Sequence, residues 1–291
     1  MNNLMQINYW TIGGFNGKKK PEQAFTEARE MGFGGVELAF EAGEFAPGIS
    51  RDRVLEIKAA AVKTGMKVAT MATGAYWGNS LSSPDPSIRA KAVAFTKEYL
   101  QVAAWMGVKT VLVVPGAVAV PWDESKPVVP YATAWKLASE SVKKLLPVSR
   151  KTGVTMAFEN VWNWFLADPI AMRTFIDQFK SHLVGSYLDV GNMAINGYAE
   201  HWIEVLGKRI KAVHFKNYTR QDCGGGLHGF GDDLNGGSVN WPAVVAALKG
   251  IKYSGPVTAE MIPFSRLPNL VLPDMALARD TAFKMKRIMG K

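Results

Sequence analysis

The run Thr152-Gly-Val-Thr-Met-Ala-Phe-Glu-Asn160 contains the joint that decides the fold. A helical stretch is expected to end at Gly153, because glycine accepts the left-handed backbone conformation that helix ends often need. A short apolar strand then follows without an intervening loop, and it ends in an acidic residue. The same joint recurs at Met106-Gly107-Val108 and, after a helix that opens at Pro21, at Met31-Gly32. These joints predict short connections from each helix into the next strand.

Outward from this joint, short apolar or β-branched runs alternate with longer amphipathic stretches along the chain. Such alternation is typical of a parallel sheet wrapped by helices. We expect eight strands, at Met5–Trp10, Gly35–Leu38, Val68–Met71, Thr110–Val114, Thr155–Phe158, Val184–Leu188, Ile210–Phe215 and Val257–Met261. No Gly-x-Gly-x-x-Gly motif follows the first strand, so the main sequence evidence for the alternative fold, an open dinucleotide-binding sheet, is missing. Without a linker in the series, residues 1–291 are expected to form one α/β domain, a (β/α)8 TIM barrel.

The composition indicates an ordinary globular protein. With 48% hydrophobic and 20% charged residues, and apolar runs no longer than a strand, neither disorder nor a membrane partner is expected. The single cysteine, Cys223, excludes an internal disulfide and a cysteine-rich zinc site. No signal-peptide pattern opens the chain, so we expect a cytoplasmic location. The net charge of +9 is dispersed apart from Lys18-Lys19-Lys20, which indicates a solvated surface and no nucleic-acid partner.

Three long loops follow strands and mark one end of the expected barrel as its working end. They span Thr73–Pro84, Pro115–Val129 and Lys216–Val239. In a barrel such loops converge at the carboxyl ends of the strands, where active sites of this fold are built. The third loop contains a glycine-rich run from Cys223 to Gly231. This run could be a lid that brings His228 to the site or, as the simpler alternative, a flexible surface loop.

Four expected strands end in a residue that can bind a divalent cation: Glu159, Asp189, His214 and Glu260. Taken singly, each would more often be a helix cap, an ion-pair partner or a core histidine. Together they occupy corresponding positions on strands five to eight, so we expect the four side chains to meet at one rim. Three carboxylates and an imidazole suit one divalent ion, Mn²⁺ first, with Co²⁺, Mg²⁺ or Zn²⁺ as alternatives.

A metal at such a site suits one kind of reaction. When a proton leaves the carbon beside a carbonyl, negative charge develops on oxygen, and a metal that holds the carbonyl and hydroxyl oxygens stabilises this charge. Carboxylates on opposite sides of that carbon could then remove and return the proton. The site therefore predicts proton transfer through a cis-enediolate.

Five motifs at expected strand ends are shared with one known superfamily. They are Gly35-Val-Glu-Leu, Glu159-Asn-Val-Trp-Asn, Leu188-Asp-Val-Gly-Asn, His214-Phe-Lys-Asn and Thr258-Ala-Glu-Met. On these motifs, and over nearly its whole length, the chain resembles the xylose-isomerase-like TIM-barrel superfamily of sugar phosphate isomerases and epimerases. Similarity to the ketose 3-epimerases in it implies a metal held by Glu159, Asp189, His214 and Glu260, with Glu159 and Glu260 also acting as the acid/base pair. It further implies that Arg220 contacts substrate oxygens.

Other positions are expected to contact a substrate. Phe165 and Asn192 stand where those epimerases have a second glutamate and a histidine, which leaves the substrate open and makes Asn192 a candidate contact. Glu37 and Lys216 could bind hydroxyls or an anionic group, with cap roles as the alternative. Tryptophans could form an apolar wall for sugar rings, or belong to the core. They are Trp77, Trp122, Trp162 and Trp164.

The leading functional hypothesis is a metal-dependent isomerase or epimerase acting on a sugar, a sugar phosphate or a keto-sugar acid. A lyase such as an inosose dehydratase is the alternative on the same site, because an enediolate can also expel a β-hydroxyl group. Two remote alternatives are a non-catalytic sugar-binding barrel and an abasic-site endonuclease, which would need more histidines than the four present. The expected partners are a small sugar or sugar phosphate and, from the superfamily, further copies of the chain in a homo-oligomer.

Overall fold

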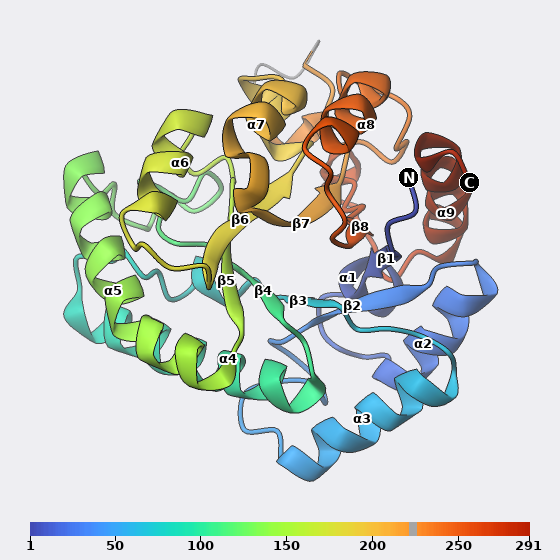
Figure 1. Ribbon diagram of the computed structural model, residues 1–291, viewed down its shortest axis with the longest axis horizontal. Coiled ribbons are helices and arrows are strands. Elements are labelled where there is room, and N and C mark those ends of the chain that lie inside the picture. Colours follow the sequence, from blue (N-terminus) through green and yellow to red (C-terminus); the bar gives the residue numbers. More distant parts are fainter. Residues whose placement is uncertain (221–225) are drawn as a thin grey trace.

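In the computed structural model, which describes residues 1–220 and 226–291, parallel strands close into a barrel (Figure 1). The strands follow one another around the barrel in chain order, and β1 closes the ring against β8. They are β1 (Met5–Asn8), β2 (Gly35–Ala39), β3 (Thr70–Ala72), β4 (Thr110–Val113), β5 (Thr155–Glu159), β6 (Val184–Asp189), β7 (Ile210–Phe215) and β8 (Val257–Ala259). The predicted (β/α)8 barrel is therefore confirmed.

Helices surround the strands in Figure 1. They are α1 (Tyr9–Gly13), α2 (Pro21–Glu30), α3 (Arg51–Lys63), α4 (Pro86–Met106), α5 (Tyr131–Thr152), α6 (Pro169–Asp177), α7 (Ala199–Leu206), α8 (Trp241–Gly250) and α9 (Met275–Met289). Short 3-10 helices are η1 (Ala75–Trp77), η2 (Asn192–Ile195), η3 (Gly207–Arg209), η4 (Leu227–Gly229) and η5 (Phe264–Arg266). Within the described residues, every helix is too short or too polar to cross a membrane.

Helix ends carry residues that suit them physically. The side chain of Asp168 accepts a hydrogen bond from the Ile170 N–H at the start of α6, and Pro169 occupies the first turn. Gly107 and Gly153 end α4 and α5 with φ angles of 88° and 67°. The helix–glycine–strand joints predicted at these two positions are confirmed, and they start β4 and β5 at the same end of the barrel.

Most predicted strands end one residue away from their end in the structure, and β1, β3 and β8 each have a boundary shifted by two residues. β1 ends at Asn8 instead of Trp10, because the Asn8 side chain accepts a hydrogen bond from the Trp10 N–H and caps α1. β3 begins at Thr70 instead of Val68, because the Ala69 N–H donates to Gln6 Oε1 (2.9 Å) and not to a neighbouring strand. The first shift matters for the site, since it places Trp10 in α1, directly beyond the carboxyl end of β1.

The core lies between the strands and the helices, and the inside of the barrel contains polar groups. Phe158 on β5 and Phe175 on α6 are fully buried, with ring centroids 5.5 Å apart. Inside the barrel, Gln6 Nε2 donates to Thr70 Oγ1 (2.9 Å) and to Thr258 Oγ1 (3.0 Å). Branched apolar side chains usually fill this space, so the polar layer indicates that the barrel supports a polar site.

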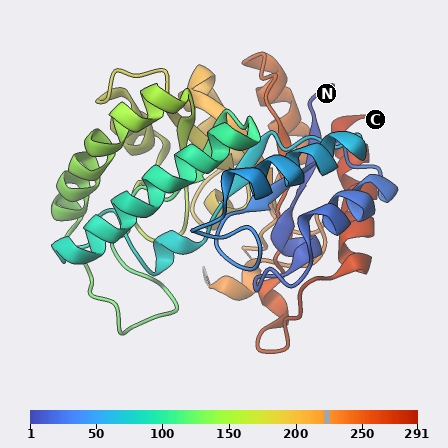
Figure 2. The same ribbon diagram turned by 90° about the horizontal axis from the view of Figure 1, so that it is seen from below.

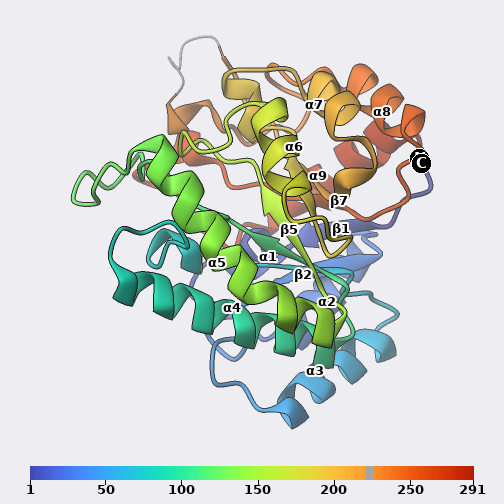
Figure 3. The same cartoon turned by 60° about the vertical axis from the view of Figure 1, so that its left-hand side comes forward.

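The two ends of the barrel differ. Figure 2 shows the loops after β4 (residues 114–130) and after β8 (residues 260–274) on one side, with both chain ends on the other. The chain ends are in contact, because Lys291 Nζ donates to the Asn3 carbonyl oxygen (2.7 Å). Figure 3 shows α4 and α5 side by side, with the loop that leads from β4 into α5 extending beyond the barrel. The loops at the carboxyl ends of the strands therefore form one distinct face.

Candidate metal centre

Four potential metal ligands meet at the carboxyl ends of the last four strands. Glu159 ends β5, Asp189 ends β6, His214 lies on β7, and Glu260 follows β8 directly. One ligand atom from each residue lies within 4.8 Å of the others. His214 Nδ1 is 3.6 Å from Glu159 Oε1 and 3.8 Å from both Asp189 Oδ2 and Glu260 Oε2. The structure thus brings together the four side chains that the strand-end pattern singled out.

Two buried atoms in this cluster lack a hydrogen-bond partner within the described residues. They are His214 Nδ1 and Asp189 Oδ2, and both residues are completely buried. Buried polar atoms almost always have a hydrogen-bond partner, so two unpaired atoms that lie 3.8 Å apart call for an explanation. A cation bound between them would satisfy both, and carboxylate oxygen with imidazole nitrogen is a donor set that divalent metals accept. The residues present therefore fit a divalent metal ion.

The imidazole of His214 is oriented from behind by Glu37. His214 Nε2 lies 2.7 Å from Glu37 Oε1. Glu37 is itself held by Asn8 Nδ2 (2.7 Å), by the Thr70 hydroxyl (2.6 Å) and by the Tyr187 hydroxyl. With Nε2 donating to Glu37, Nδ1 can present its lone pair to a metal, as in many carboxylate–histidine–metal sites. Glu37 was expected to contact a substrate, and the structure gives it these buried partners instead.

Burial and the crowding of acidic groups together shift the pKa values of the cluster. Burial, assisted by the charges of Glu260 and Asp189, raises the pKa of Glu159 to about 7. Burial likewise raises the pKa of Asp189 to about 6. Burial opposes a charge on His214, but the carboxylates of Glu37 and Glu260 outweigh it and raise the pKa of the imidazole well above its usual range. The cluster therefore favours positive charge at its centre, which protons or a divalent cation can supply.

Lys216 adds a buried cation beside the cluster. Its Nζ donates to Glu260 Oε2 (2.8 Å) and lies 4.7 Å from the centroid of the Phe230 ring. Burial opposes the ammonium charge, but the carboxylates of Glu260 and Asp189 outweigh it and raise the pKa of Lys216. Lys216 therefore remains charged and fixes the position of one Glu260 oxygen.

The cluster opens into a cavity of about 480 Å³, which we call the metal pocket. Its lining includes Glu159, Glu260 and Lys216, whereas Asp189 and His214 lie behind them, fully buried. Four tryptophans also line the pocket, namely Trp10, Trp77, Trp122 and Trp162. Trp122 packs against Trp77 with ring centroids 4.5 Å apart and against Trp162 at 4.9 Å. The volume and the mixed lining are those of a small-molecule site.

Glu41 also lines the metal pocket and was missed in the sequence. It follows β2, and its carboxylate accepts hydrogen bonds from Trp10 Nε1 (2.6 Å) and from the Gly74 N–H. Burial raises the pKa of this carboxyl above its usual range. Its position just beyond the second strand could have indicated a pocket residue, but the prediction named Glu37 in the same segment.

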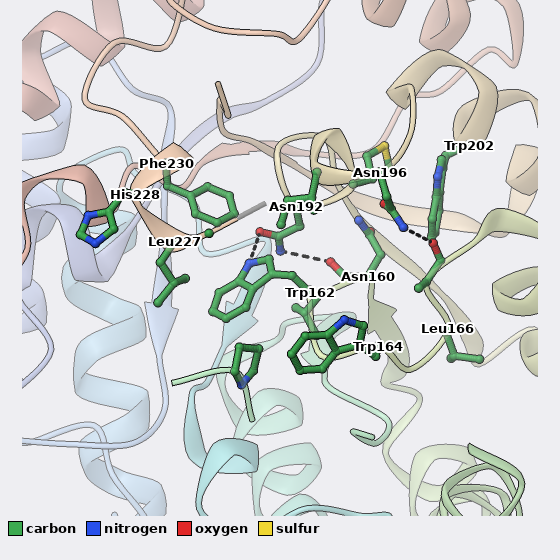
Figure 4. Close-up of a pocket in the computed structure, with 16 residues that line it drawn as sticks. Asn160, Trp162, Trp164, Leu166, Asn192, Asn196, Trp202, Leu227, His228 and Phe230 are labelled. Carbon is green, nitrogen blue, oxygen red and sulfur yellow. Dashed lines mark hydrogen bonds between the residues drawn. The ribbon is translucent and has the colours of Figure 1, made fainter. Parts of the chain in front are cut away.

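Of the other residues expected to contact a substrate, some line the metal pocket and others lie outside it. Asn192 lines the metal pocket, with Nδ2 3.4 Å from Glu159 Oε1. Arg220 is outside the lining, because its Nε donates to the Ala194 carbonyl (2.6 Å) and its guanidinium lies 4.5 Å from the centroid of the Tyr198 ring. His228 lines a neighbouring cavity, shown in Figure 4. Of the glycine-rich run, Cys223 to Gly225 lie outside the described residues.

Phe165 shows how one departure from the epimerase pattern is accommodated. Its side chain is buried and packs against Phe175 at 5.6 Å and Tyr131 at 5.5 Å between ring centroids. The position where ketose 3-epimerases have a glutamate therefore belongs to the core here.

Comparison with known proteins gives concordant matches. The family profile described as "Xylose isomerase-like TIM barrel" matches residues 25–282. D-psicose 3-epimerase from Ruminiclostridium cellulolyticum is 26% identical over 260 residues, which cover 86% of this chain and 80% of that protein. The structure of D-psicose 3-epimerase with D-tagatose from Clostridium cellulolyticum H10 superposes with a TM-score of 0.80 at 20% identity, over 98% of this chain and 99% of that one. The apo form of 3-keto-D-glucoside 4-epimerase from E. coli superposes with a TM-score of 0.73 at 17% identity, over 98% and 99%.

Proposed function

Because the chain belongs to the xylose isomerase-like TIM-barrel family, we propose that it is a metal-dependent sugar epimerase or isomerase. The observation that carries this proposal is the arrangement of its four ligands. Asp189 and His214 are fully buried, whereas Glu159 and Glu260 face the metal pocket and lie on separate strand ends. Two ligands thus only hold a cation, and two can also reach a substrate. The curated relative and the solved structures named above support the same class of reaction.

The metal would be held by Glu159, Asp189, His214 and Glu260, with Mn²⁺ as the first choice and Co²⁺, Mg²⁺ or Zn²⁺ as alternatives. When bound, it acts as a Lewis acid that stabilises negative charge on the oxygens of a keto sugar. The protein supplies the proton transfer. Glu159 and Glu260 approach the pocket from β5 and β8, so one can remove a proton from the carbon beside the carbonyl while the other returns it. Lys216 keeps Glu260 in place for this task.

The pocket favours a neutral sugar over a sugar phosphate. Lys216 is the one cationic side chain among the described residues of its lining, and its ammonium is already paired with Glu260. A phosphate group would need free cations or several backbone N–H donors. The faces of Trp122 and Trp162 suit the apolar face of a sugar, and the carboxylate of Glu41 can accept a bond from a hydroxyl group.

A deuterium-exchange experiment tests the proposal. The Mn²⁺-loaded protein is incubated in deuterated water with D-fructose, D-psicose and D-tagatose, and exchange of the C–H proton beside the carbonyl is followed by mass spectrometry. We expect exchange by the native chain and a loss of about 10²–10⁴-fold in Glu159→Gln and Glu260→Gln. Glu204→Gln, an exposed carboxylate on α7, serves as the matched control and should keep full activity. A fully loaded native protein that exchanges no proton in a broad sugar panel would contradict the proposal, and loss of water from the sugar would redirect it to a lyase.

A further inference from the structure

A second cavity of about 400 Å³ adjoins the metal pocket, and we call it the side cavity (Figure 4). It shares Trp162 and Asn192 with the metal pocket. These two side chains are bonded to each other, because Trp162 Nε1 donates to Asn192 Oδ1 (3.1 Å). Asn192 Nδ2 in turn lies 3.4 Å from Glu159 Oε1. A single layer of side chains therefore separates the side cavity from a metal ligand.

The loop after β5 holds an indole at the side cavity in an unusual conformation. Trp164 and Leu166 both line this cavity and have positive φ angles of 61° and 54°, which side chains other than glycine rarely adopt. Buried Asn163 holds this loop in place. Its side chain accepts a hydrogen bond from the Phe165 N–H (3.0 Å) and donates one to the Gly116 carbonyl (2.8 Å). Trp164 nevertheless remains 56% exposed. Backbone strain that is maintained by a buried anchor and leaves a large aromatic ring in solvent is typical of a binding site.

The chemistry of the side cavity points to a neutral sugar ring. Its described lining contains no Lys, Arg, Asp or Glu, and His228 is its one titratable side chain. Trp162, Trp164 and Trp202 supply aromatic surface. Asn196 donates from Nδ2 to the Ala167 carbonyl (3.1 Å), which leaves its amide oxygen without a partner among the described residues. Aromatic faces with amide groups between them bind polyhydroxylated rings, whereas a phosphate or a carboxylate would meet no cation there.

We propose that the side cavity binds a second sugar ring, so that this protein acts on keto sugars that carry a glycosyl group. The keto unit lies in the metal pocket and the glycosyl unit in the side cavity, with Trp162 and Asn192 between them. The glycosidic bond is not broken, since only the proton beside the carbonyl is exchanged. The identity of the keto unit rests on the proposed function, whereas recognition of the glycosyl unit does not.

Binding is measured with disaccharides whose keto unit is fructose. Lactulose carries a galactosyl group on O4 and isomaltulose a glucosyl group on O6, and D-fructose alone is the reference. Calorimetry on the Mg²⁺-loaded native protein should show that one disaccharide binds at least about tenfold more tightly than fructose, or ~1.4 kcal/mol. Saturation-transfer NMR should show the glycosyl ring in contact with the protein.

Variants of the side cavity should remove this advantage. Trp164→Ala is expected to weaken disaccharide binding about tenfold and to leave fructose binding unchanged. Asn196→Ala is the second variant, and both side chains are exposed enough for the fold to be kept. Phe283→Ala is the matched control, because Phe283 is an equally exposed aromatic residue on α9 outside both cavities.

The outcomes separate this inference from the proposed function. Disaccharides that bind no more tightly than fructose, or an advantage that both variants retain, would overturn the inference even if fructose is epimerised. Binding that depends on Trp164 or Asn196, in a protein that exchanges no sugar proton, would support the side cavity and remove the proposed reaction.

Discussion

Glu37 sets the direction of the His214 ring, so that Nδ1 faces the three carboxylates of the proposed metal site. Glu37 is completely buried and receives hydrogen bonds from Asn8, Thr70 and Tyr187, so its carboxylate has no freedom to turn away. Replacing a partner of this kind typically weakens a metal site about 10–100-fold. At the scale of single residues, the site therefore extends one layer below the four ligands.

Glu37→Gln tests this dependence directly. The substitution keeps the size of the side chain but removes the negative charge that faces His214 Nε2. We expect Mn²⁺ affinity to fall about 10–100-fold, measured by titration calorimetry. Glu204→Gln, which lies on the surface of α7, should leave it unchanged. Equal affinities in all three proteins would mean that Glu37 has only a packing role.

Among the elements, the loop after β8 connects the working face to α9. Arg266 in this loop donates to Asp232 Oδ2 (2.8 Å) and to Asp274 Oδ2 (2.7 Å). Asp274 is also the N-cap of α9, since its Oδ1 accepts from the Leu277 N–H (2.9 Å). The carboxylate of Asp274 thus binds Arg266 in the loop and also caps α9, the last helix around the barrel.

Asp274→Ala should lower the free energy of unfolding by about 0.5–2 kcal/mol at pH 7. Partial burial opposes ionisation of Asp274, but the Leu277 N–H and Arg266 outweigh it and lower the pKa of the carboxyl below 3.8. This contribution is complete above the unfolded-state pKa and is lost as the pH falls through the lower folded-state pKa. Urea unfolding should therefore show a difference between native and variant that shrinks toward pH 3. Asp274→Asn, which can still cap, should lose less, and a difference that grows on acidification would refute this account.

Across the whole molecule, the proposed metal site joins the last four strands of the closed barrel. Because the ligands belong to β5, β6, β7 and the end of β8, a bound ion stabilises the folded chain and not the unfolded one. At a metal concentration of 100 Kd this amounts to about 2.7 kcal/mol, which for a chain of 291 residues corresponds to a rise in Tm of roughly 4 °C. Calorimetric scans with Mn²⁺ and with a chelator measure the difference. Glu159→Gln should show a smaller rise, and an unchanged native Tm would indicate that no ion binds.

The sequence predicted the barrel and the meeting of the four candidate ligands because both depend on local patterns. Gly107 and Gly153 mark helix ends, and the ligands come at the ends of apolar runs, where strand periodicity places them at one rim. Glu41 was not found, because nothing local distinguishes it from Glu37 as the carboxylate that reaches the pocket. The side cavity depends on the left-handed conformation of Trp164, which is imposed by tertiary contacts and leaves no local signal.

The contact between residues 3 and 291 makes this barrel a candidate for circular permutation. Lys291 reaches Asn3 on the side opposite the working face, so a short peptide could join the ends far from the metal pocket. New ends could then be opened at a surface joint such as Gly65, between α3 and β3, without cutting a strand. A circularly permuted chain of this kind would keep every ligand on its own strand, and the order in which the strands are synthesised would change while the site stays the same.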